Sequence, residues 1–365
     1  MKVKFNRAAL QDALSLVSSI VPSRTPKPIL QCLRITTEDA AVRISATDLE
    51  AGITQLVKQV DIEQPGDIVV PADKLNSIVR ESFDEVIELQ AAESSVHLIG
   101  SDSRFTIYAH DPDQYPVVPG FEGQPELEVK LDKLQEGIEL TVFAAAKEST
   151  RYALNGILWE VQGKKLALVA TDGRRLSKAV IGLEKVDAVP EGRIIVPAKT
   201  MSILDKIPAR SDASAGIRFM DNQIAVICGD VVVSSNLLEG NFPRYEDIIP
   251  TDYQKKVSLP TAPTLSAVRR AALLATEDSK GIKLSLDKHT LVFTSRAPET
   301  GDAQIDMAVE YEGEPIEIGF NPQFMADALR VLKVNDFELH LGQSDRPGLI
   351  KSGSDFLYLI MPVNL

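Results

Sequence analysis

Two short clusters of polar residues have the types and spacing that could do chemistry. Asp111-Pro112-Asp113 places two carboxylates one residue apart, as in a metal site, although Asp and Pro together are more typical of a turn. Thr171-Asp172-Gly173-Arg174-Arg175 combines a hydroxyl, a carboxylate and two guanidinium groups, which could hold a phosphate or a sugar. Because Thr47-Asp48 stands at the equivalent place 124 residues earlier, we expect the second cluster to be a turn that ends a strand.

The motifs of the common enzyme classes are missing from this sequence. It has no G-x-x-x-x-G-K-[ST] phosphate loop, because Gly163-Lys164 lacks the earlier glycine, and no G-x-G-x-x-G, H-E-x-x-H or G-x-S-x-G. The histidines are scattered, and neither cysteine stands near one at the spacing of zinc ligands; they are His97, His110, His289 and His340. We therefore predict that the protein is not an enzyme and uses no cofactor and no metal.

Composition indicates a soluble globular protein, with 44% hydrophobic and 25% charged residues. No apolar run approaches the roughly 18 residues of a membrane span. The charged segment Met1–Arg7 leads into a stretch interrupted by Gln11 and Asp12, unlike a signal peptide. Cys32 and Cys228 lie inside apolar runs, so we expect buried free thiols, which suit the reducing cytoplasm.

A pattern that recurs three times predicts the domain organisation. Val70-Pro71-Ala72, Val196-Pro197-Ala198 and Gly319-Phe320-Asn321 each precede a helical stretch, with 126 and 124 residues between Pro71, Pro197 and Asn321. A second series, Thr47, Thr171 and Ser295, has a spacing of 124 residues at both steps. This period is domain-sized rather than the length of a solenoid repeat. We therefore expect three copies of one domain of about 120 residues.

Hydrophobic periodicity predicts two helices and several strands in each copy. The predicted helices are 5–20, 72–83, 131–147, 197–207, 262–276 and 321–332. The predicted strands include 41–45, 86–89, 166–169, 223–227, 290–294 and 337–341. Helices alternating with short apolar runs indicate an α+β fold with antiparallel sheet. Pro- and Gly-rich linkers at 119–128 and 250–256 give the domain boundaries 1–122, 126–252 and 254–365.

The acidic residues are concentrated outside the predicted helices. The chain has a net charge of −13, which argues against nucleic acid if the charge is spread evenly. The six predicted helices together carry +2, which leaves −15 for the remaining residues. If the helices share a face, that face would attract a phosphate backbone weakly and without sequence preference. The alternative is that each helix has a mixed, solvated face and the sum arises by chance.

These features together resemble the bacterial sliding clamps, the β subunits of DNA polymerase III, over the whole chain. The residues that carry the resemblance are Tyr152-x-Leu154-Asn155-Gly156, Thr171-Asp172-Gly173 with Arg175-Leu176, Phe242-Pro243 with Tyr245, Gly319-Phe320-Asn321, and Met361-Pro362-Val363-x-Leu365. The resemblance implies three tandem DNA-clamp domains, each with two helices packed on antiparallel sheet. Two chains would form a six-domain ring around duplex DNA, tethering the replicative polymerase without chemistry.

The resemblance also implies a pocket for short peptides from polymerases, the clamp loader and repair proteins. Its residues here would be Arg151, Leu154, Thr171, Gly173, Arg175, Leu176, Pro243, Ile248, Phe324, Met361, Pro362 and Leu365. Leu176, Ile248, Met361 and Pro362 would form an apolar slot for Leu or Phe anchors. The chain departs from the family at Asp247, where a basic residue is familiar, at Asn364 and at Ala153.

Two further sets of residues follow from the resemblance. DNA contacts are expected at Arg24, Lys74, Arg80, Tyr152 and Lys199, with Asp73 standing where better-known clamps carry Arg. The interface between two subunits is expected to join Phe105 and Ile107 of the first domain to Leu273 and Leu274 of the third, by pairing of edge strands. For each of these residues the alternative is ordinary packing in the core.

Two other functions remain possible from the sequence. One is a three-domain protein-interaction scaffold that does not encircle DNA. The other is an enzyme whose phosphate or sugar site lies at Thr171–Arg175.

Overall fold

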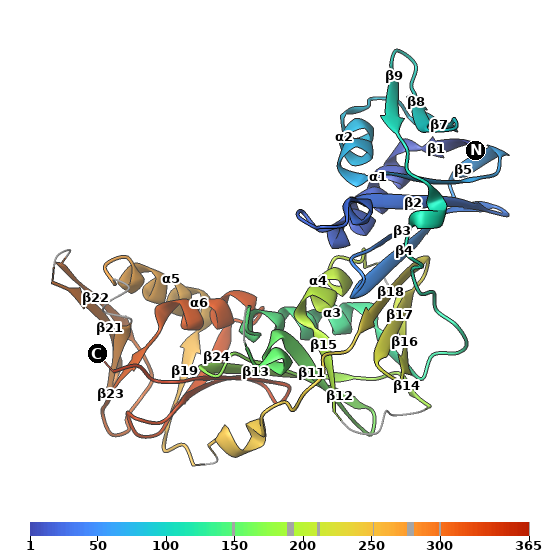
Figure 1. The fold of residues 1–365 in the computed structure, drawn as a ribbon. Helices are drawn as coiled ribbons and strands as arrows, with labels where there is room; N and C mark the ends of the chain where they lie inside the picture. Colours follow the sequence, from blue (N-terminus) through green and yellow to red (C-terminus); the bar gives the residue numbers. More distant parts are fainter. Residues whose placement is uncertain are drawn as a thin grey trace. The chain divides into compact units, whose positions relative to one another are not determined.

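The computed structural model describes residues 1–147, 150–187, 193–209, 212–250, 252–275, 281–298 and 301–364 (Figure 1). The chain forms two compact units. The first unit comprises Met1–Leu134, Leu183–Glu191 and Lys199–Leu237. The second comprises Gln135–Gly182, Gly192–Ala198 and Leu238–Leu365. Each unit therefore contains one end of the chain and about half of its middle third, so the units do not follow the repeat.

Six α-helices lie in the described ranges, two for each copy of the sequence repeat, as predicted. They are α1 (Arg7–Val17), α2 (Ala72–Glu81), α3 (Leu131–Glu139), α4 (Ala198–Leu204), α5 (Thr261–Ala272) and α6 (Pro322–Val331). Asn6 Oδ1 accepts a hydrogen bond from Ala9 N, and Asn321 Oδ1 accepts one from Gln323 N, so both side chains cap helix N-termini. Pro322 occupies the first turn of α6, where its missing N–H removes no helical hydrogen bond.

The helices are shorter than the periodicity predicts. Phe5 belongs to a strand and is fully buried, so α1 begins after it. The predicted helix 131–147 is wrong beyond Glu139, because α3 ends there and only a 3₁₀ turn at Val142–Ala144 follows. The Thr141 hydroxyl donates to Gly137 O at 2.7 Å and so engages a carbonyl at the helix end. Residue 276, the expected end of the fifth helix, lies outside the described residues.

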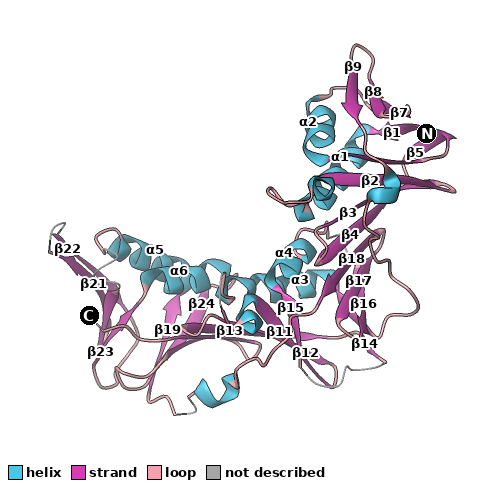
Figure 2. Ribbon diagram, viewed as in Figure 1, coloured by secondary structure: helices cyan, strands magenta, loops and turns pink. Residues whose placement is uncertain are grey.

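All strand pairings are antiparallel, as predicted, and they form two sheets in each unit (Figure 2). The first unit contains the sheet β5 (Val60–Gln64), β1 (Lys2–Asn6), β7 (Val86–Ala91), β8 (Ser95–Ile99), β9 (Arg104–Tyr108). Its second sheet is β14 (Lys185–Val186), β10 (Leu127–Lys130), β16 (Ser214–Met220), β17 (Gln223–Cys228), β18 (Val231–Asn236), β4 (Ala51–Val57), β3 (Ala41–Thr47), β2 (Cys32–Glu38), β6 (Asp67–Pro71).

The second unit repeats this arrangement. Its larger sheet is β15 (Ile194–Pro197), β11 (Gly156–Gln162), β12 (Lys165–Thr171), β13 (Arg175–Gly182), β26 (Phe356–Ile360), β25 (Gly348–Ser352), β24 (Asp336–Leu341), β19 (Lys255–Pro260). Its smaller sheet is β22 (Gly301–Ala308), β21 (Thr290–Ala297), β20 (Ile282–Asp287), β23 (Ile316–Phe320). Helices α5 and α6 lie side by side on one face of these strands (Figure 2).

The larger sheet of each unit is continuous between successive copies of the repeat. In the first unit β4 pairs with β18, and Ile53 lies opposite Val233. In the second unit β13 pairs with β26, and Ser177 lies opposite Tyr358. Strands more than 175 residues apart in the sequence are thereby joined by backbone hydrogen bonds. The short linkers between the domains did not by themselves predict that a sheet continues from one domain into the next.

The environment of the two cysteines agrees with the prediction from the sequence. Cys32 and Cys228 are buried free thiols, as predicted. Burial raises the pKa of the Cys32 thiol to about 11, and it raises the pKa of Cys228 as well. Across the described segments, no helix is both long enough and apolar enough to span a bilayer.

We predict that Ile53→Ala lowers the free energy of unfolding by about 2–5 kcal/mol, because the fully buried Ile53 packs at the β4–β18 pairing and truncation leaves a cavity. Urea denaturation followed by circular dichroism measures the change. The matched control is Val232→Ala on the neighbouring strand, where the side chain is only half-buried and a loss below about 1 kcal/mol is expected. Equal losses in the two variants would contradict the importance of this junction.

Candidate functional site

The segment Thr171–Arg175 is a strand-ending turn, as predicted from its likeness to Thr47-Asp48. The Thr171 hydroxyl donates to Arg175 O at 2.6 Å and accepts from Gly173 N at 3.1 Å. Asp172 Oδ1 accepts from the backbone N–H groups of Arg174 and Arg175. Gly173 has φ +86°, which favours glycine. The hydroxyl and carboxylate therefore fold the turn, rather than pointing outward as a phosphate clamp.

The same bonds recur in the first copy, and the structure corrects one equivalence inferred from the sequence. Thr47 donates to Ala51 O at 2.7 Å, just as Thr171 donates to Arg175 O. Ala51 is therefore the counterpart of Arg175. Ser295 is not equivalent to the two threonines, because β21 continues beyond it and its hydroxyl donates to Ala271 O in α5.

Arg175 is the centre of a buried polar network in the second unit. Its guanidinium donates to Asp172 Oδ2 at 3.0 Å, to Asp327 Oδ2 at 2.8 Å and to Phe143 O at 2.7 Å. The side chain is only 9% exposed. Burial opposes the charged form, yet the interactions with Tyr358, Asp327 and Asp172 together raise the pKa of Arg175 above its usual value. The network joins the turn to the 3₁₀ segment Val142–Ala144 and to α6.

Two aromatic rings flank the Arg175 guanidinium. Its central carbon lies 4.4 Å from the centroid of the Phe324 ring and 5.6 Å from that of Phe143. Tyr358 donates its hydroxyl proton to Phe324 O at 3.0 Å, which holds the backbone of α6 from below. The Arg175 guanidinium therefore restricts the position of the Phe324 ring, and Phe324 is one of the expected pocket residues.

All the expected pocket residues that the structure describes belong to the second unit, but they differ in exposure. Ile248 and Met361 are 46% and 39% exposed, and Phe324 and Pro362 are half-buried. Arg151, Gly173 and Pro243 are also exposed. These residues have surface available to a ligand. Leu365 lies outside the described residues.

Four of the expected pocket residues are buried instead. Leu176 is wholly buried, so it does not belong to the wall of an apolar slot as the sequence suggested. It points into a core cluster with Leu158, Val169 and Leu359, since alternate residues of β13 face inward. Leu154, Thr171 and Arg175 are also buried. These four residues support the site from beneath.

The three departures from the family pattern occupy different environments. Asp247 and Asn364 are exposed, so both can change the charge around a ligand. Ala153 is 6% exposed and packs in the same core cluster as Leu176, where a larger aromatic side chain would need space that the neighbours fill.

Most of the cations expected to contact DNA already have carboxylate partners. Lys74 lies 3.3 Å from Asp73, and Arg80 lies 3.2 Å from Glu81. Lys199 pairs with Asp48 and also donates to Ile20 O. Arg24 is exposed and has no carboxylate partner in the described ranges, and Tyr152 is 72% exposed. Exchange of these surface pairs for phosphate pairs would gain little free energy per contact.

Of the residues expected at a subunit interface, Phe105 and Ile107 lie on the edge strand β9, and Leu273 and Leu274 directly follow α5. Phe105 on β9 is 42% exposed and Leu273 is 79% exposed, while Leu274 is half-buried. Ile107 is 6% exposed, so its side chain packs in the core, as the alternative interpretation had it. Sequence reasoning missed Tyr108, which is 81% exposed at the end of β9. Alternation along the strand makes Tyr108 point away from Ile107 and could have revealed it.

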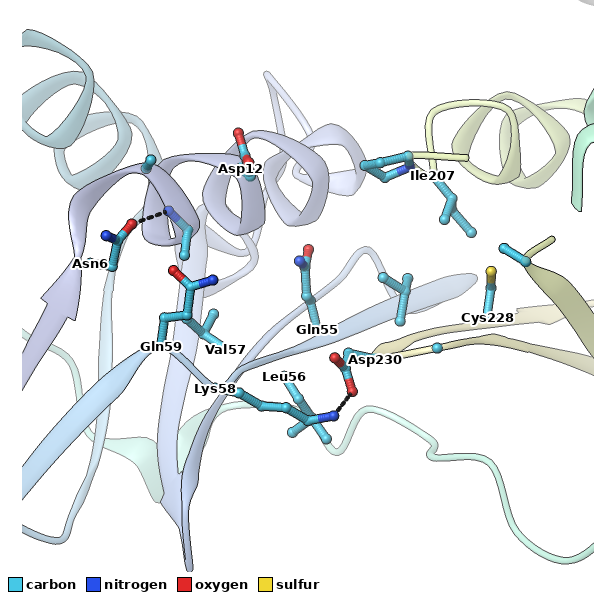
Figure 3. A pocket seen from close by; sticks show the side chains of 16 residues that line it. Asn6, Asp12, Gln55, Leu56, Val57, Lys58, Gln59, Ile207, Cys228 and Asp230 are labelled. Atoms are coloured by element: carbon cyan, nitrogen blue, oxygen red, sulfur yellow. Dashed lines mark hydrogen bonds and ion pairs between the residues drawn. The ribbon is translucent and has the colours of Figure 1, made fainter. Parts of the chain in front are cut away.

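A separate cavity of about 470 Å³ lies in the first unit, beside α1 and β4 (Figure 3). Its lining includes Asp12, Gln55 and the Cys228 thiol, and Lys58 forms an ion pair with Asp230 at 2.5 Å. In the part of the chain that the structure describes, no group of three His, Cys, Asp or Glu residues is placed to hold a metal. The cavity does not assemble the acid, base and nucleophile of a catalytic site.

Family models match the chain in three successive segments. They are described as the N-terminal, central and C-terminal domains of the DNA polymerase III beta subunit, and they match residues 1–119, 128–244 and 246–364. The order and extent of these matches confirm three tandem domains, each with two helices and antiparallel sheet.

Individual relatives are similar to the chain over its full length. The beta sliding clamps of Pseudomonas aeruginosa and Bacillus subtilis are each 31% identical to it, covering 100% of this chain and 100% and 99% of the relatives. Among solved structures, a Pseudomonas aeruginosa sliding clamp bound to griselimycin has a TM-score of 0.93 at 31% identity, with both chains covered completely. The DNA polymerase III beta subunit of Thermotoga maritima has a TM-score of 0.91 at 27% identity, covering 100% of this chain and 99% of that one.

We predict that Arg175→Ala lowers the free energy of unfolding by about 3–5 kcal/mol, because Asp172 and Asp327 then lose a buried counter-charge. Urea denaturation measures the loss. The control is Arg174→Ala at the exposed neighbouring position, which is expected to change stability by less than about 0.5 kcal/mol. A loss below about 1 kcal/mol in the Arg175 variant would show that the network does not support the fold.

Proposed function

The chain belongs to the family of DNA polymerase III β subunits, the bacterial sliding clamps, and from that premise we propose that two copies join head to tail around duplex DNA. The chain is thus a sliding clamp of DNA polymerase III. The homodimer and the ring around DNA are our proposal for this chain. The repeated pairing of strands between domains is the observation that supports it best.

Within the chain, the same kind of pairing joins one domain to the next on two occasions. Strand β4 of the first domain pairs with β18 of the second, and β13 of the second pairs with β26 of the third. By position in the repeat, β22 corresponds to β4 and β13, and β9 corresponds to β18 and β26. The third pairing in this series would join β22 to the β9 strand of a second copy.

Both strands are available for such a pairing. Each is at an edge of its sheet and has a partner on one side only within the described residues. An exposed edge with unpaired N–H and C=O groups favours pairing with another strand. Arg104 lies on β9, and Asp302 and Asp306 lie on β22, so the charges of the two edges are complementary. Phe105 and Leu273 would be buried near the junction.

A closed ring would hold duplex DNA by topology rather than by tight binding. We propose Arg24, Lys74, Arg80, Tyr152 and Lys199 as the residues that contact the phosphate backbone. The carboxylates beside Lys74, Arg80 and Lys199 weaken each contact. Weak contacts without base recognition would allow the clamp to move along the duplex.

We also propose that the second unit binds the peptides of polymerases, the clamp loader and repair proteins. Met361, Pro362 and Ile248 offer apolar surface, and Phe324 is held in place by Arg175. A Pseudomonas aeruginosa relative has been crystallised with griselimycin, so a clamp of closely similar fold accepts a ligand. Gly173, Pro243, Arg151 and Leu365 complete the proposed contact set, while the buried Leu154, Thr171 and Leu176 support it from beneath.

The remaining features of the proposal follow from the role of a tether. The protein would do no chemistry itself and would need no membrane partner. We place it in the cytoplasm, where bacterial DNA is replicated and where buried free thiols such as Cys32 stay reduced. The domain boundaries proposed from the sequence, 1–122, 126–252 and 254–365, are kept.

We predict that the double variant Phe105→Ala, Leu273→Ala is a monomer, because both truncations remove apolar surface from the proposed junction. Light scattering coupled to gel filtration measures the mass, and the parent protein should have twice the 39.8 kDa of one chain. Met220→Ala is the control, since Met220 is exposed and lies on β16, in a different sheet from β9 and β22. A parent protein of 39.8 kDa would refute the dimer.

We predict that the parent protein, loaded by a clamp loader with ATP onto nicked circular duplex DNA, stays bound through gel filtration at about 0.5 M salt, where simple phosphate contacts are screened. Linearising the circle should release it, because the clamp then slides off the ends. The monomeric double variant should not be retained. Release at the same rate from circles and linear DNA would refute encirclement and favour the scaffold.

A further inference from the structure

A groove with a volume of about 1230 Å³ lies in the second unit beside the proposed peptide pocket. Its lining comes from the C-terminal part of α5 with the residues after it, and from α6 between Asn321 and Arg330. Helices α5 and α6 lie side by side (Figure 1). The C-terminal segment Met361–Val363 also contributes to the lining. The sequence analysis did not predict this groove, because its lining comes from four separate segments of the chain, around Arg174, Arg269, Phe324 and Met361.

Three arginines line this groove, and its lining includes no Asp or Glu among the described residues. They are Arg174, Arg269 and Arg330, and all three are exposed. Arg174 and Arg269 have no carboxylate partner within the described ranges. In a chain with a net charge of −13, such a concentration of positive charge indicates an anionic occupant.

Asp327, the carboxylate that pairs with Arg330, interacts mainly with other groups. Asp327 lies 3.5 Å from Arg330, the longest of its contacts. Its Oδ2 accepts from Arg175 at 2.8 Å, and its Oδ1 accepts from the Gln323 side chain at 2.6 Å. The charge of Arg330 is therefore only weakly compensated. The N-terminus of α6, which carries partial positive charge, adds to the field of the groove.

The apolar part of the lining distinguishes between possible anions. Met361 and Phe324 line the groove together with the arginines. A phosphate backbone offers no apolar groups for such contacts, whereas a peptide can carry both apolar and acidic side chains. Leu273 also lines the groove, but the proposed ring would cover it. The amphipathic lining thus fits a peptide better than a nucleic acid.

Phe324, Met361 and Pro362 belong both to the groove and to the proposed peptide pocket. A peptide whose Leu or Phe anchors lie at the pocket would therefore continue directly into the groove. We propose that the groove binds an acidic flank of the partner peptide, held by Arg174, Arg269 and Arg330. This inference rests on the proposed function of the pocket and adds a preference for acidic partners.

The test uses fluorescent synthetic peptides with a Leu-Ala-Leu-Phe anchor, extended at either end by three Asp or by three Asn residues. Anisotropy titrations on the full-length protein give the affinities. We expect one Asp-extended peptide to bind about tenfold more tightly than its Asn counterpart at about 50 mM salt, since three exposed ion pairs contribute modestly. The difference should shrink at about 500 mM salt.

The triple variant Arg174→Gln, Arg269→Gln, Arg330→Gln should lose this preference and keep the affinity for the Asn-extended peptide. Arg296→Gln, at an exposed arginine of the same unit outside the groove lining, is the matched control and should keep the preference. Equal affinities for Asp and Asn peptides on the parent protein would overturn the groove and leave the pocket intact.

Two other outcomes would also overturn the inference. If the Asn-extended peptide does not bind the parent protein at all, the proposed pocket itself is wrong. If a DNA oligonucleotide binds in an arginine-dependent way and displaces the Asp-extended peptide at lower concentration, the groove is a nucleic-acid site.

Discussion

Antiparallel pairing of strands between successive domains is the interaction on which the rest of this structure depends. A domain of this type ends in strands whose backbone N–H and C=O groups require partners. The chain satisfies this requirement twice by antiparallel pairing between successive domains, β4 with β18 and β13 with β26. Three copies of one domain linked in this way leave one edge of each type unpaired. A second copy of the chain is then the natural partner, since it presents the same two edges.

The β13–β26 junction also determines where a partner site can lie. Arg175 is the first residue of β13 and lies opposite Ile360 on β26. Its buried charge is compensated by Asp172 from its own turn and by Asp327 from α6. Such a network adds specificity to the packing, because loss of one member leaves a buried charge unpaired. The result is a rigid base beneath exposed side chains such as Met361, which can adapt to different peptides.

Local signals in the sequence predicted local structure well. Asn321 and Pro322 placed the start of α6, and the Thr-Asp pairs placed two turns whose hydrogen bonds involve neighbouring residues. The end of α3 was missed because it depends on a side-chain bond of Thr141 to the backbone. The continuity of the sheets was missed for a different reason. It joins strands such as β4 and β18, which lie far apart in the sequence. The hydrophobic pattern of a strand does not indicate which other strand it pairs with.

The candidate site shows the same difference between local features, which the sequence predicted, and long-range contacts, which it did not. The resemblance assigned the pocket residues to one region of the chain, yet the positions of single side chains depend on tertiary packing. Leu176 and Ile107 are apolar residues on strands, and only the fold shows that both face the core. The partner of Lys199 could not be read from the sequence either, because Asp48 lies 151 residues away. The arginines of the groove come from three separate segments, which no spacing rule connects.

The distribution of charge explains how an acidic protein can work on DNA. A net charge of −13 repels a polyanion at long range, but screening limits this repulsion to about 10 Å at moderate salt. Inside a ring the contacts need not supply the affinity, since closure prevents escape. Carboxylates beside Lys74, Arg80 and Lys199 then become useful. In the proposed ring they would keep each phosphate contact weak, so that the free energy would vary little as the clamp moves along the duplex.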